Sequence, residues 1–204
     1  YTQGTSTNDR KGCPDADSDG WSDPDEGWGP NNGADAFALE PSQWMDSDND
    51  GYGDEIDGFE GDHCPYRRGY SMNDRFGCLD SDGDGWSDED PGGLDGVEPW
   101  FAHPAGLGDS FPFDSTQWQD TDEDQYGDNW ADGSWNESRA NWSIGEWLDN
   151  ATTPDSCPFI TGFSNQDRFG CPDEDGDGWS NPDENWTAAE GADAFPTIPS
   201  QWSD

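Results

Sequence analysis

Residues 15–26 carry acidic side chains at the alternating positions that a calcium-binding loop requires. Asp15, Asp17 and Asp19 stand at loop positions 1, 3 and 5, and Gly20 follows at position 6, where the chain must reverse. A calcium ion takes six to eight oxygen ligands at about 2.3–2.6 Å, and alternate residues of a tight loop can direct their oxygens inward together. With a backbone carbonyl at position 7 and acids at positions 9 and 12, the stretch matches the EF-hand loop pattern in full. The spacing therefore predicts a calcium site and not a solvated acidic turn.

Four more stretches share this arrangement, so we expect about five or more bound Ca²⁺ ions. We call the stretches loop 1 (15–26), loop 2 (46–57), loop 3 (80–91), loop 4 (120–131) and loop 5 (173–184). Position 7 is Trp or Tyr in each loop and is expected to contribute its backbone carbonyl. The predicted ligands are Asp15, Asp17, Asp19, Trp21, Asp23 and Glu26; Asp46, Asp48, Asp50, Tyr52, Asp54 and Asp57; Asp80, Asp82, Asp84, Trp86, Asp88 and Asp90; Asp120, Asp122, Asp124, Tyr126 and Asp128; and Asp173, Asp175, Asp177, Trp179, Asn181 and Glu184.

Three of the loops depart from the full pattern. Loop 3 ends in Pro91, so its last ligand must come from elsewhere, with Asp90 and Asp95 as the alternatives. Loop 4 has Gln125 in place of the glycine and Ala131 at position 12, and loop 5 has a neutral amide at position 9. We therefore expect loops 1, 2 and 5 to be the best sites, and loops 3 and 4 to be weaker or completed by remote ligands.

The composition argues against an ordinary hydrophobic core. Leu, Ile and Val together number ten in 204 residues, and aromatic residues make up 14% of the chain, half of its 28% hydrophobic content. The formal charge is −41, and five divalent ions would bring it to −31. Nucleic acid and anionic membranes are therefore excluded as partners, and no apolar run approaches the roughly 20 residues of a membrane-spanning helix. We expect little regular secondary structure and small aromatic clusters pinned by metal ions and disulfides.

The sequence repeats itself. Unit 1 covers residues 1–65, unit 2 covers 66–158 with an insertion at about 129–154, and unit 3 covers 159–204 and stops partway through its pattern. The first half of each unit carries a loop ending in Gly-Trp-Ser, and the second half carries one ending in Tyr-Gly-Asp, of which Asp204 would open a third copy. Tandem units of this kind predict a repeat protein whose units contact their neighbours along the chain.

Four of the five cysteines fall in equivalent pairs. Cys64 and Cys78, like Cys157 and Cys171, are 14 residues apart, and each pair would close the same short loop. We predict two disulfides, and the repeat register places the partner of Cys13 before Tyr1, outside this sequence. A zinc site is the competing interpretation, but the spacing lacks the usual pair of closely placed cysteines. Disulfides indicate an oxidising, extracellular setting.

Aromatic residues take the cysteine positions in the other half of each unit. We expect a Phe–Trp contact there in place of the disulfide, in the pairs Phe37 and Trp44, Phe111 and Trp118, and Phe195 and Trp202. The Asp-Arg steps at residues 9–10, 74–75 and 167–168 are predicted to form structural ion pairs.

The tandem acidic loops with Cys-Pro steps, as in GCPDADSDGWSDPDE and DSDNDGYGDEIDGFEGDHCP, resemble thrombospondin type 3 repeats, in particular the long-spaced forms of microbial secreted and cell-surface proteins. The resemblance covers nearly the whole chain except the insertion. It implies an elongated, core-poor chain wrapped around calcium, in which a loop can share carboxylates with a second ion. Candidates for that shared role are Asp25, Asp90 and Asp183 at position 11, and Asp35, Asp62, Asp109, Asp155 and Asp193 in the Asp-x-Cys or Asp-x-Phe steps.

The insertion adds sequons and tryptophans. Asn136, Asn141 and Asn150 within it, and Asn185 beyond it, head Asn-x-Ser/Thr sequons, so we expect surface sites for covalent glycans. Its four tryptophans suggest either additional local packing, which we favour, or a sugar-binding platform.

These features predict a secreted or cell-surface structural protein. We expect a calcium-stiffened spacer, stalk or filament at a microbial surface, which continues as a longer repeat chain or self-associates. The alternatives are a calcium-dependent adhesin whose insertion binds a glycan or protein, and a calcium reservoir. We do not expect an enzyme, because the chain has two histidines, no Gly-x-Ser-x-Gly motif, and a composition ill suited to a shaped pocket.

Overall fold

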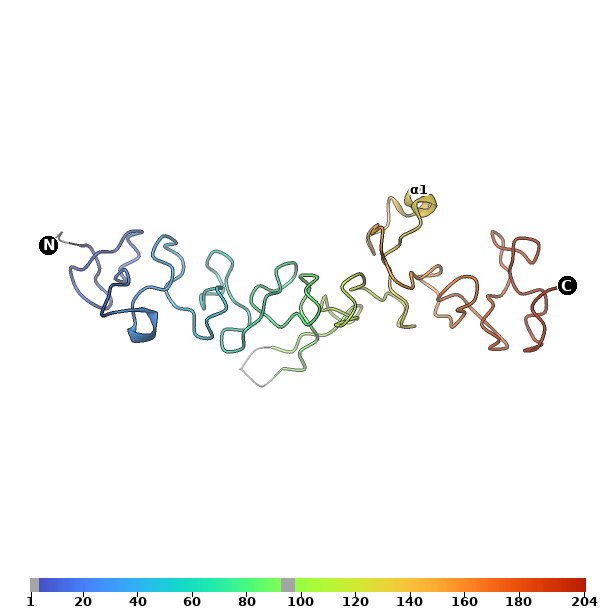
Figure 1. Ribbon diagram of the computed structural model, residues 1–204, viewed down its shortest axis with the longest axis horizontal. Helices are drawn as coiled ribbons and strands as arrows, with labels where there is room; N and C mark the ends of the chain where they lie inside the picture. Colours follow the sequence, from blue (N-terminus) through green and yellow to red (C-terminus); the bar gives the residue numbers. More distant parts are fainter. Residues whose placement is uncertain (1–3, 93–97) are drawn as a thin grey trace. The chain divides into compact units, whose positions relative to one another are not determined.

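The computed structural model describes residues 4–92 and 98–204, and Asp95, one alternative for the last ligand of loop 3, lies outside them. The described chain consists almost wholly of turns and irregular loops (Figure 1). Its helices are η1, Pro30–Asn32, η2, Gly133–Trp135, and α1, Asn136–Arg139, and its β-structure is limited to isolated bridges. The predicted fold class is confirmed: almost no regular secondary structure, two disulfides and repeated acidic clusters. None of the helices in the described residues has the length and apolar composition needed to cross a bilayer.

The chain forms two compact units, Tyr1–Pro99 and Trp100–Asp204. The division falls inside the second sequence repeat, residues 66–158, so sequence repeats and compact units are different partitions of the chain. Loops 1–3 belong to the first compact unit, and loops 4 and 5 belong to the second.

Each acidic loop reverses direction through left-handed residues at positions 4 and 6. In loop 1 these are Ser18, with φ 72°, and Gly20, with φ 102°. A left-handed residue that carries a side chain costs about 1–2 kcal/mol, which explains the glycine at position 6 of four loops. Loop 4 has side chains at both positions, Glu123 with φ 64° and Gln125 with φ 76°. Loop 4 is therefore the most strained of the five turns.

Both predicted disulfides are formed. Cys64 bonds to Cys78 with a Cα–Cα distance of 5.1 Å, and Cys157 bonds to Cys171 at 5.0 Å. Each closes a loop of 14 residues, and in the chain-entropy model such a closure stabilises the fold by roughly 3 kcal/mol. Cys13 is half-buried and has no partner in this chain.

Polar side chains fill much of the buried interior of the described residues. The large buried hydrophobic side chains there are Trp118, Trp130 and Ile144, whereas hydroxyl, amide and carboxylate groups are buried throughout. Ser71, for example, is fully buried, and its hydroxyl donates to the carbonyls of Arg75 and Cys78. Hydrogen-bonded turns thus take the place of a continuous hydrophobic core.

Gln43 organises the turn that follows loop 2. Its side chain is 1% exposed, and its Nε2 donates to the carbonyls of Glu55 at 2.8 Å and Phe59 at 3.1 Å. Its Oε1 accepts the Glu55 N–H at 3.0 Å. Gln117 makes the equivalent bonds after loop 4, to Asn129 and Thr152. The sequence reasoning overlooked both glutamines, although their fixed place before the Trp of each Gln-Trp pair was visible.

The arginines of two Asp-Arg steps, Arg10 and Arg168, form ion pairs, but with aspartates later in the chain. Arg10 Nη1 lies 2.6 Å from Asp25, while the neighbouring Asp9 accepts hydrogen bonds from the Ser22 N–H and hydroxyl. Arg168 and Asp183 repeat the pair at 2.7 Å, whereas the partner of Asp90 is Arg67, which lies outside the Asp-Arg step, at 3.8 Å. An arginine therefore lies against each position-11 aspartate, and their expected role in sharing a second ion stays a prediction.

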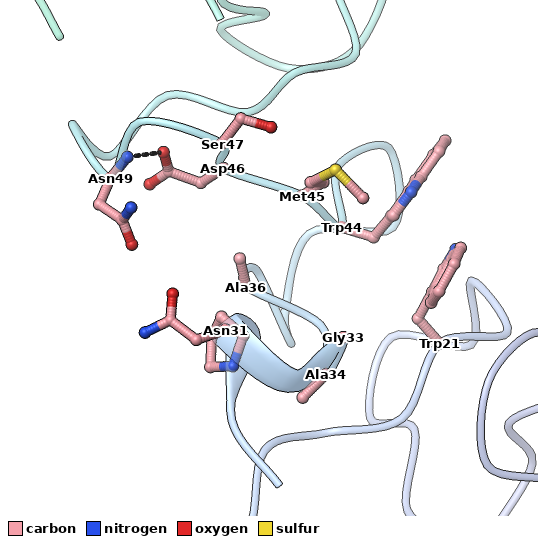
Figure 2. Close-up of a pocket in the computed structure, with 11 residues that line it drawn as sticks. Trp21, Asn31, Gly33, Ala34, Ala36, Trp44, Met45, Asp46, Ser47 and Asn49 are labelled. Atoms are coloured by element: carbon pink, nitrogen blue, oxygen red, sulfur yellow. Dashed lines mark hydrogen bonds between the residues drawn. The ribbon is translucent and has the colours of Figure 1, made fainter. Parts of the chain in front are cut away.

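Two of the tryptophans expected to contact phenylalanine, Trp44 and Trp202, stack on the position-7 tryptophan of the preceding loop, and the pair Phe111 and Trp118 stays a prediction. Trp44 stacks on Trp21 of loop 1 with the ring centroids 6.0 Å apart and the planes 8° from parallel (Figure 2). Trp202 stacks on Trp179 of loop 5 in the same way, with the ring centroids 5.9 Å apart. Next to Phe37, a backbone hydrogen bond links the two segments, from the Ala36 N–H to the Trp44 carbonyl at 3.0 Å.

The position-7 aromatic residue connects one half-unit to the next. In loops 2 and 4 this residue is a tyrosine. Tyr52 packs on Phe76 and Tyr126 packs on Phe169, both with ring centroids 5.7 Å apart. Position 7 was singled out for its carbonyl, and the contribution of its ring was missed.

Replacing Gln43 by alanine should lower the free energy of unfolding by about 2–4 kcal/mol, because one buried N–H and two carbonyls lose their partner. Chemical denaturation in calcium-containing buffer measures the change. Gln201→Ala is the matched control, since Gln201 holds the same repeat position but is exposed, and its effect should be near zero. Equal effects of the two substitutions would contradict the structural role of Gln43.

Candidate metal sites

Five clusters of three aspartates could each hold a metal ion. They come from positions 1, 3 and 5 of every loop, and within each cluster one carboxylate oxygen per residue lies within 4.8 Å of the others. The clusters are Asp15, Asp17 and Asp19; Asp46, Asp48 and Asp50; Asp80, Asp82 and Asp84; Asp120, Asp122 and Asp124; and Asp173, Asp175 and Asp177. The alternating spacing therefore brings together the residues that it predicted.

Backbone N–H groups fix the first aspartate of each cluster. Asp46 Oδ1 accepts the N–H of Asn49 at 2.7 Å (Figure 2), and its Oδ2 accepts the N–H of Gly51 at 3.1 Å. These are the left-handed residues at positions 4 and 6, so the turn and the cluster form together. The same two bonds hold Asp120 in loop 4, from Glu123 and Gln125.

Most aspartates at positions 3 and 5 use one oxygen for the turn, and in Asp50 and Asp124 the second oxygen also accepts an N–H, from Gly69 and Gly162 at 3.0 Å. Asp48 Oδ1 accepts the Asp50 N–H at 3.2 Å, and Asp50 Oδ1 accepts the Tyr52 N–H at 2.9 Å. The second oxygen is buried without a hydrogen-bond partner in Asp17, Asp19, Asp48, Asp84, Asp175 and Asp177. A buried carboxylate oxygen without a donor is costly, and a cation at the cluster would satisfy it.

A fourth carboxylate comes from the Asp-x-Cys or Asp-x-Phe step that follows the loop. Asp35, Asp62, Asp155 and Asp193 are each 1–2% exposed. The N–H of each donates to the carbonyl at position 8 of loop 1, 2, 4 or 5, respectively, at 2.7–2.9 Å. One oxygen accepts the N–H two residues ahead, and the other is buried without a hydrogen-bond partner. We call these four residues the remote aspartates.

The electrostatics confirm which loop each remote aspartate faces. Burial raises the pKa of Asp35 to about 6, that of Asp62 to about 7 and that of Asp155 to about 9. The neighbouring charges that add to burial belong to loops 1, 2 and 4, respectively. In loop 5 the charge of Asp193 contributes to the raised pKa of Asp177, behind burial and Asp175. Each remote aspartate thus stands beside the three carboxylates of the preceding loop, and whether it shares a second ion stays a prediction.

In loops 1, 2, 3 and 5 the position-9 side chain accepts a hydrogen bond from the backbone N–H at position 2. Asp54 accepts the Ser47 N–H at 2.9 Å, and Asn181 accepts the equivalent Glu174 N–H at 3.2 Å, so the amide of loop 5 can replace a carboxylate in this role. Asp128 of loop 4 differs. Its Oδ2 accepts the Thr121 hydroxyl at 2.6 Å, and its Oδ1 is buried without a hydrogen-bond partner.

The acids at position 12 stand on the surface, and their role as ligands stays a prediction. Glu26, Asp57 and Glu184 are exposed, because the chain after each loop enters a turn and not the helix of an EF-hand. The geometry offers the remote aspartates as the fourth carboxylate instead. The Ala at position 12 of loop 4 then removes no ligand, whereas the last ligand of loop 3 stays open. The carbonyl at position 7 remains a prediction in every loop.

All four sequon asparagines are exposed. Asn136 begins α1, and its Oδ1 accepts the indole N–H of Trp130 at 2.7 Å, which leaves its Nδ2 out of that bond. Glycosylation of Asn136, Asn141, Asn150 and Asn185 stays a prediction.

Replacing Asp62 by asparagine should weaken calcium binding at loop 2 by about tenfold or more, since the ligand charge count tunes the affinity of such loops. Asp57→Asn is the matched control, because it removes the same charge from an exposed position 12 and should leave the affinity nearly unchanged. The amide resonance of Gly53 during a calcium titration provides the site-specific midpoint. If Asp57→Asn weakened calcium affinity more than Asp62→Asn, the position-12 acid would be the ligand and Asp62 would not.

Without metal, the folded chain should be more stable at pH 5 than at pH 8. The folded-state pKa values of Asp35, Asp62 and Asp155, about 6, 7 and 9, lie above the ordinary 3.8. Their stabilising contribution is therefore complete below about pH 4 and is lost as the pH rises through 6–9. Groups with lowered values, such as Asp9 and Asp167, change stability only below about pH 4.

Small-angle scattering of the metal-free chain across this pH range measures the dependence, as a shift toward the compact form at low pH. The calcium affinity should rise over the same interval, because the ion binds the ionised carboxylates. If the metal-free folded form became more stable between pH 5 and pH 8, burial could not be raising the pKa values of these carboxyl groups.

The chain matches no protein-family model, and no curated protein matches it. The resemblance to thrombospondin type 3 repeats accordingly rests on the repeated acidic motifs and the largely irregular chain.

Proposed function

We propose that this chain is an extracellular calcium-binding structural protein of the thrombospondin type 3-like kind, in which bound Ca²⁺ takes the place of a hydrophobic core. The observation that carries the proposal is the set of buried carboxylate oxygens that have no hydrogen-bond donor, four of which come from the remote aspartates. Hard oxygen ligands in this number suit calcium better than a transition metal, which would favour His or Cys.

Calcium binding would then be coupled to folding. The chain carries −41 formal charges, and the loops gather carboxylates where repulsion is greatest. No preformed site is expected in the unfolded chain, so the free energy of binding adds to the free energy of folding. A repeat chain stiffened in this way suits a spacer, stalk or filament at a microbial surface, and offers no evident means of catalysis.

The disulfides and the exposed surface support an extracellular location and lateral contacts. Two disulfides are typical of an oxidising compartment. Large hydrophobic side chains, such as Leu39 and Phe113, are more than four-fifths exposed, and could contact further copies of the repeat. The partners we propose are calcium, neighbouring repeats and glycans on the sequons. The charge disfavours nucleic acid.

The adhesin alternative receives less support. Three of the insertion's tryptophans, Trp130, Trp135 and Trp142, surround Arg139 at 4.3–5.2 Å and so serve internal packing. Trp147 is half exposed and would have to carry a sugar platform alone.

Small-angle scattering with and without a chelator tests the proposal. The calcium-loaded chain should have a well-defined shape, and removal of calcium should expand it into a flexible, self-repelling coil. Equilibrium dialysis in parallel should give about five ions per chain. An identical scattering profile after calcium removal would overturn the structural role of the ion.

A further inference from the structure

The insertion lies between loop 4 and its remote aspartate, yet it keeps the hydrogen bond that joins loop 2, which has no insertion, to its own remote aspartate. Asp155 follows Gly127 by 28 positions, whereas Asp62 follows Gly53 by 9. Nevertheless the Asp155 N–H donates to the Gly127 carbonyl at 2.8 Å, as the Asp62 N–H does to the Gly53 carbonyl at 2.7 Å. The additional residues therefore form an excursion between two points that remain neighbours.

A short neck closes this excursion. The Trp130 N–H donates to the Glu146 carbonyl at 3.0 Å, and the Leu148 N–H donates to the Trp130 carbonyl at 2.9 Å. The side chain of Asn129, which is fully buried, accepts the Glu146 N–H at 2.7 Å. The insertion is thus held in register with the residues that follow loop 4.

Arg139 reaches from α1 back to the loop and bridges its two halves. Its side chain is buried, with 4% of the residue exposed. Nη1 donates to the carbonyl of Asp128 at 3.2 Å, and Nη2 donates to the carbonyl of Asp155. Asp128 is position 9 of loop 4, and Asp155 is its remote aspartate. One planar guanidinium therefore fixes the spacing of two residues whose carboxylates each keep a buried oxygen without a hydrogen-bond partner.

Three indole rings hold the guanidinium in place. Its carbon lies 4.3 Å from the Trp135 ring centroid, 4.8 Å from that of Trp142 and 5.2 Å from that of Trp130. Arginine stacks on aromatic faces and is weakly hydrated, so contact with the three rings offsets the cost of removing the guanidinium from water. The Trp130 indole in turn donates to Asn136 at 2.7 Å. The insertion's aromatic residues therefore serve to orient a single side chain.

Loop 4 is the loop that most needs such support. It alone carries side chains at both left-handed positions, Glu123 and Gln125, at a cost of about 1–2 kcal/mol each. We propose that Arg139 is a positioning residue for a calcium site at loop 4, and that the insertion serves to hold Asp128 and Asp155 in ligating geometry. This inference rests on the proposed calcium-binding function.

The charge of Arg139 by itself would act in the opposite direction, since a cation near the site disfavours Ca²⁺. Arg139→Lys keeps that charge but loses the planar pair of donors, and Arg139→Met loses both. A positioning role requires both substitutions to weaken the site, whereas a purely electrostatic role requires Arg139→Met to strengthen it and Arg139→Lys to leave it unchanged.

The experiment titrates calcium into the full-length chain and follows two amide resonances, Gly127 at loop 4 and the equivalent Gly53 at loop 2. Both variants should raise the Gly127 midpoint about 10–100-fold, as is usual when a partner behind the ligands is removed, and leave the Gly53 midpoint unchanged. The indole N–H resonance of Trp130 reports that the insertion is still folded in Arg139→Lys.

A second measurement uses the wild-type chain and so does not depend on the folding of a variant. Because coupling between two groups is reciprocal, filling loop 4 should slow hydrogen exchange of the Leu148 amide in the neck by a similar factor. Unchanged Leu148 exchange, or a Gly127 midpoint unaffected by Arg139→Lys, would overturn the positioning role while leaving the Gly53 response intact. Failure of both Gly53 and Gly127 to respond to calcium in the wild type would instead overturn the proposed function, and the positioning role with it.

Discussion

The crowding of buried carboxylates is the constraint on which the rest of this structure depends. Every loop brings three aspartates within 4.8 Å, and in loops 1, 2, 4 and 5 a remote aspartate is buried beside them. Two unit charges about 4 Å apart repel by about 1 kcal/mol in water, and by more when water is excluded. A divalent cation at each cluster would turn this repulsion into the main local attraction, which is why so few aliphatic residues can suffice.

The polar groups around the clusters maintain the turns that the carboxylates need. The buried serines, Gln43 and Gln117 satisfy backbone groups that strands or helices would satisfy in an ordinary domain. Within each compact unit, an aromatic pair from position 7 joins neighbouring half-units, and a disulfide joins alternate ones as well. Contacts between neighbouring half-units thus hold the backbone in place of regular secondary structure.

The sequence was most informative where chemistry depends on close spacing. Alternating aspartates sufficed to predict the five clusters, and the repeat register sufficed to predict which cysteines pair. It was less informative where a partner lies beyond the local turn. Arg10 pairs with Asp25 and not with the adjacent Asp9, and Trp44 stacks on Trp21 and not on Phe37.

The remote aspartates and Arg139 illustrate the same limit. Asp62 was recognised as a candidate ligand, but its place beside loop 2 follows from one hydrogen bond between its N–H and the carbonyl of Gly53. Asp57 was predicted as the last ligand from the EF-hand pattern, but a turn follows loop 2 here and Asp57 is exposed, so Asp62 competes with it for that place. For Arg139 no repeat exists to compare, so its role depends on how the insertion folds back.

Anomalous scattering from calcium in crystals of the metal-loaded chain would test the central claim most directly. We expect one peak within each acidic cluster, with the remote aspartate of loops 1, 2, 4 and 5 in the first coordination sphere at about 2.3–2.6 Å. Clusters that remained without peaks at saturating calcium, or peaks coordinated by the exposed acids at position 12 in place of the remote aspartates, would contradict it.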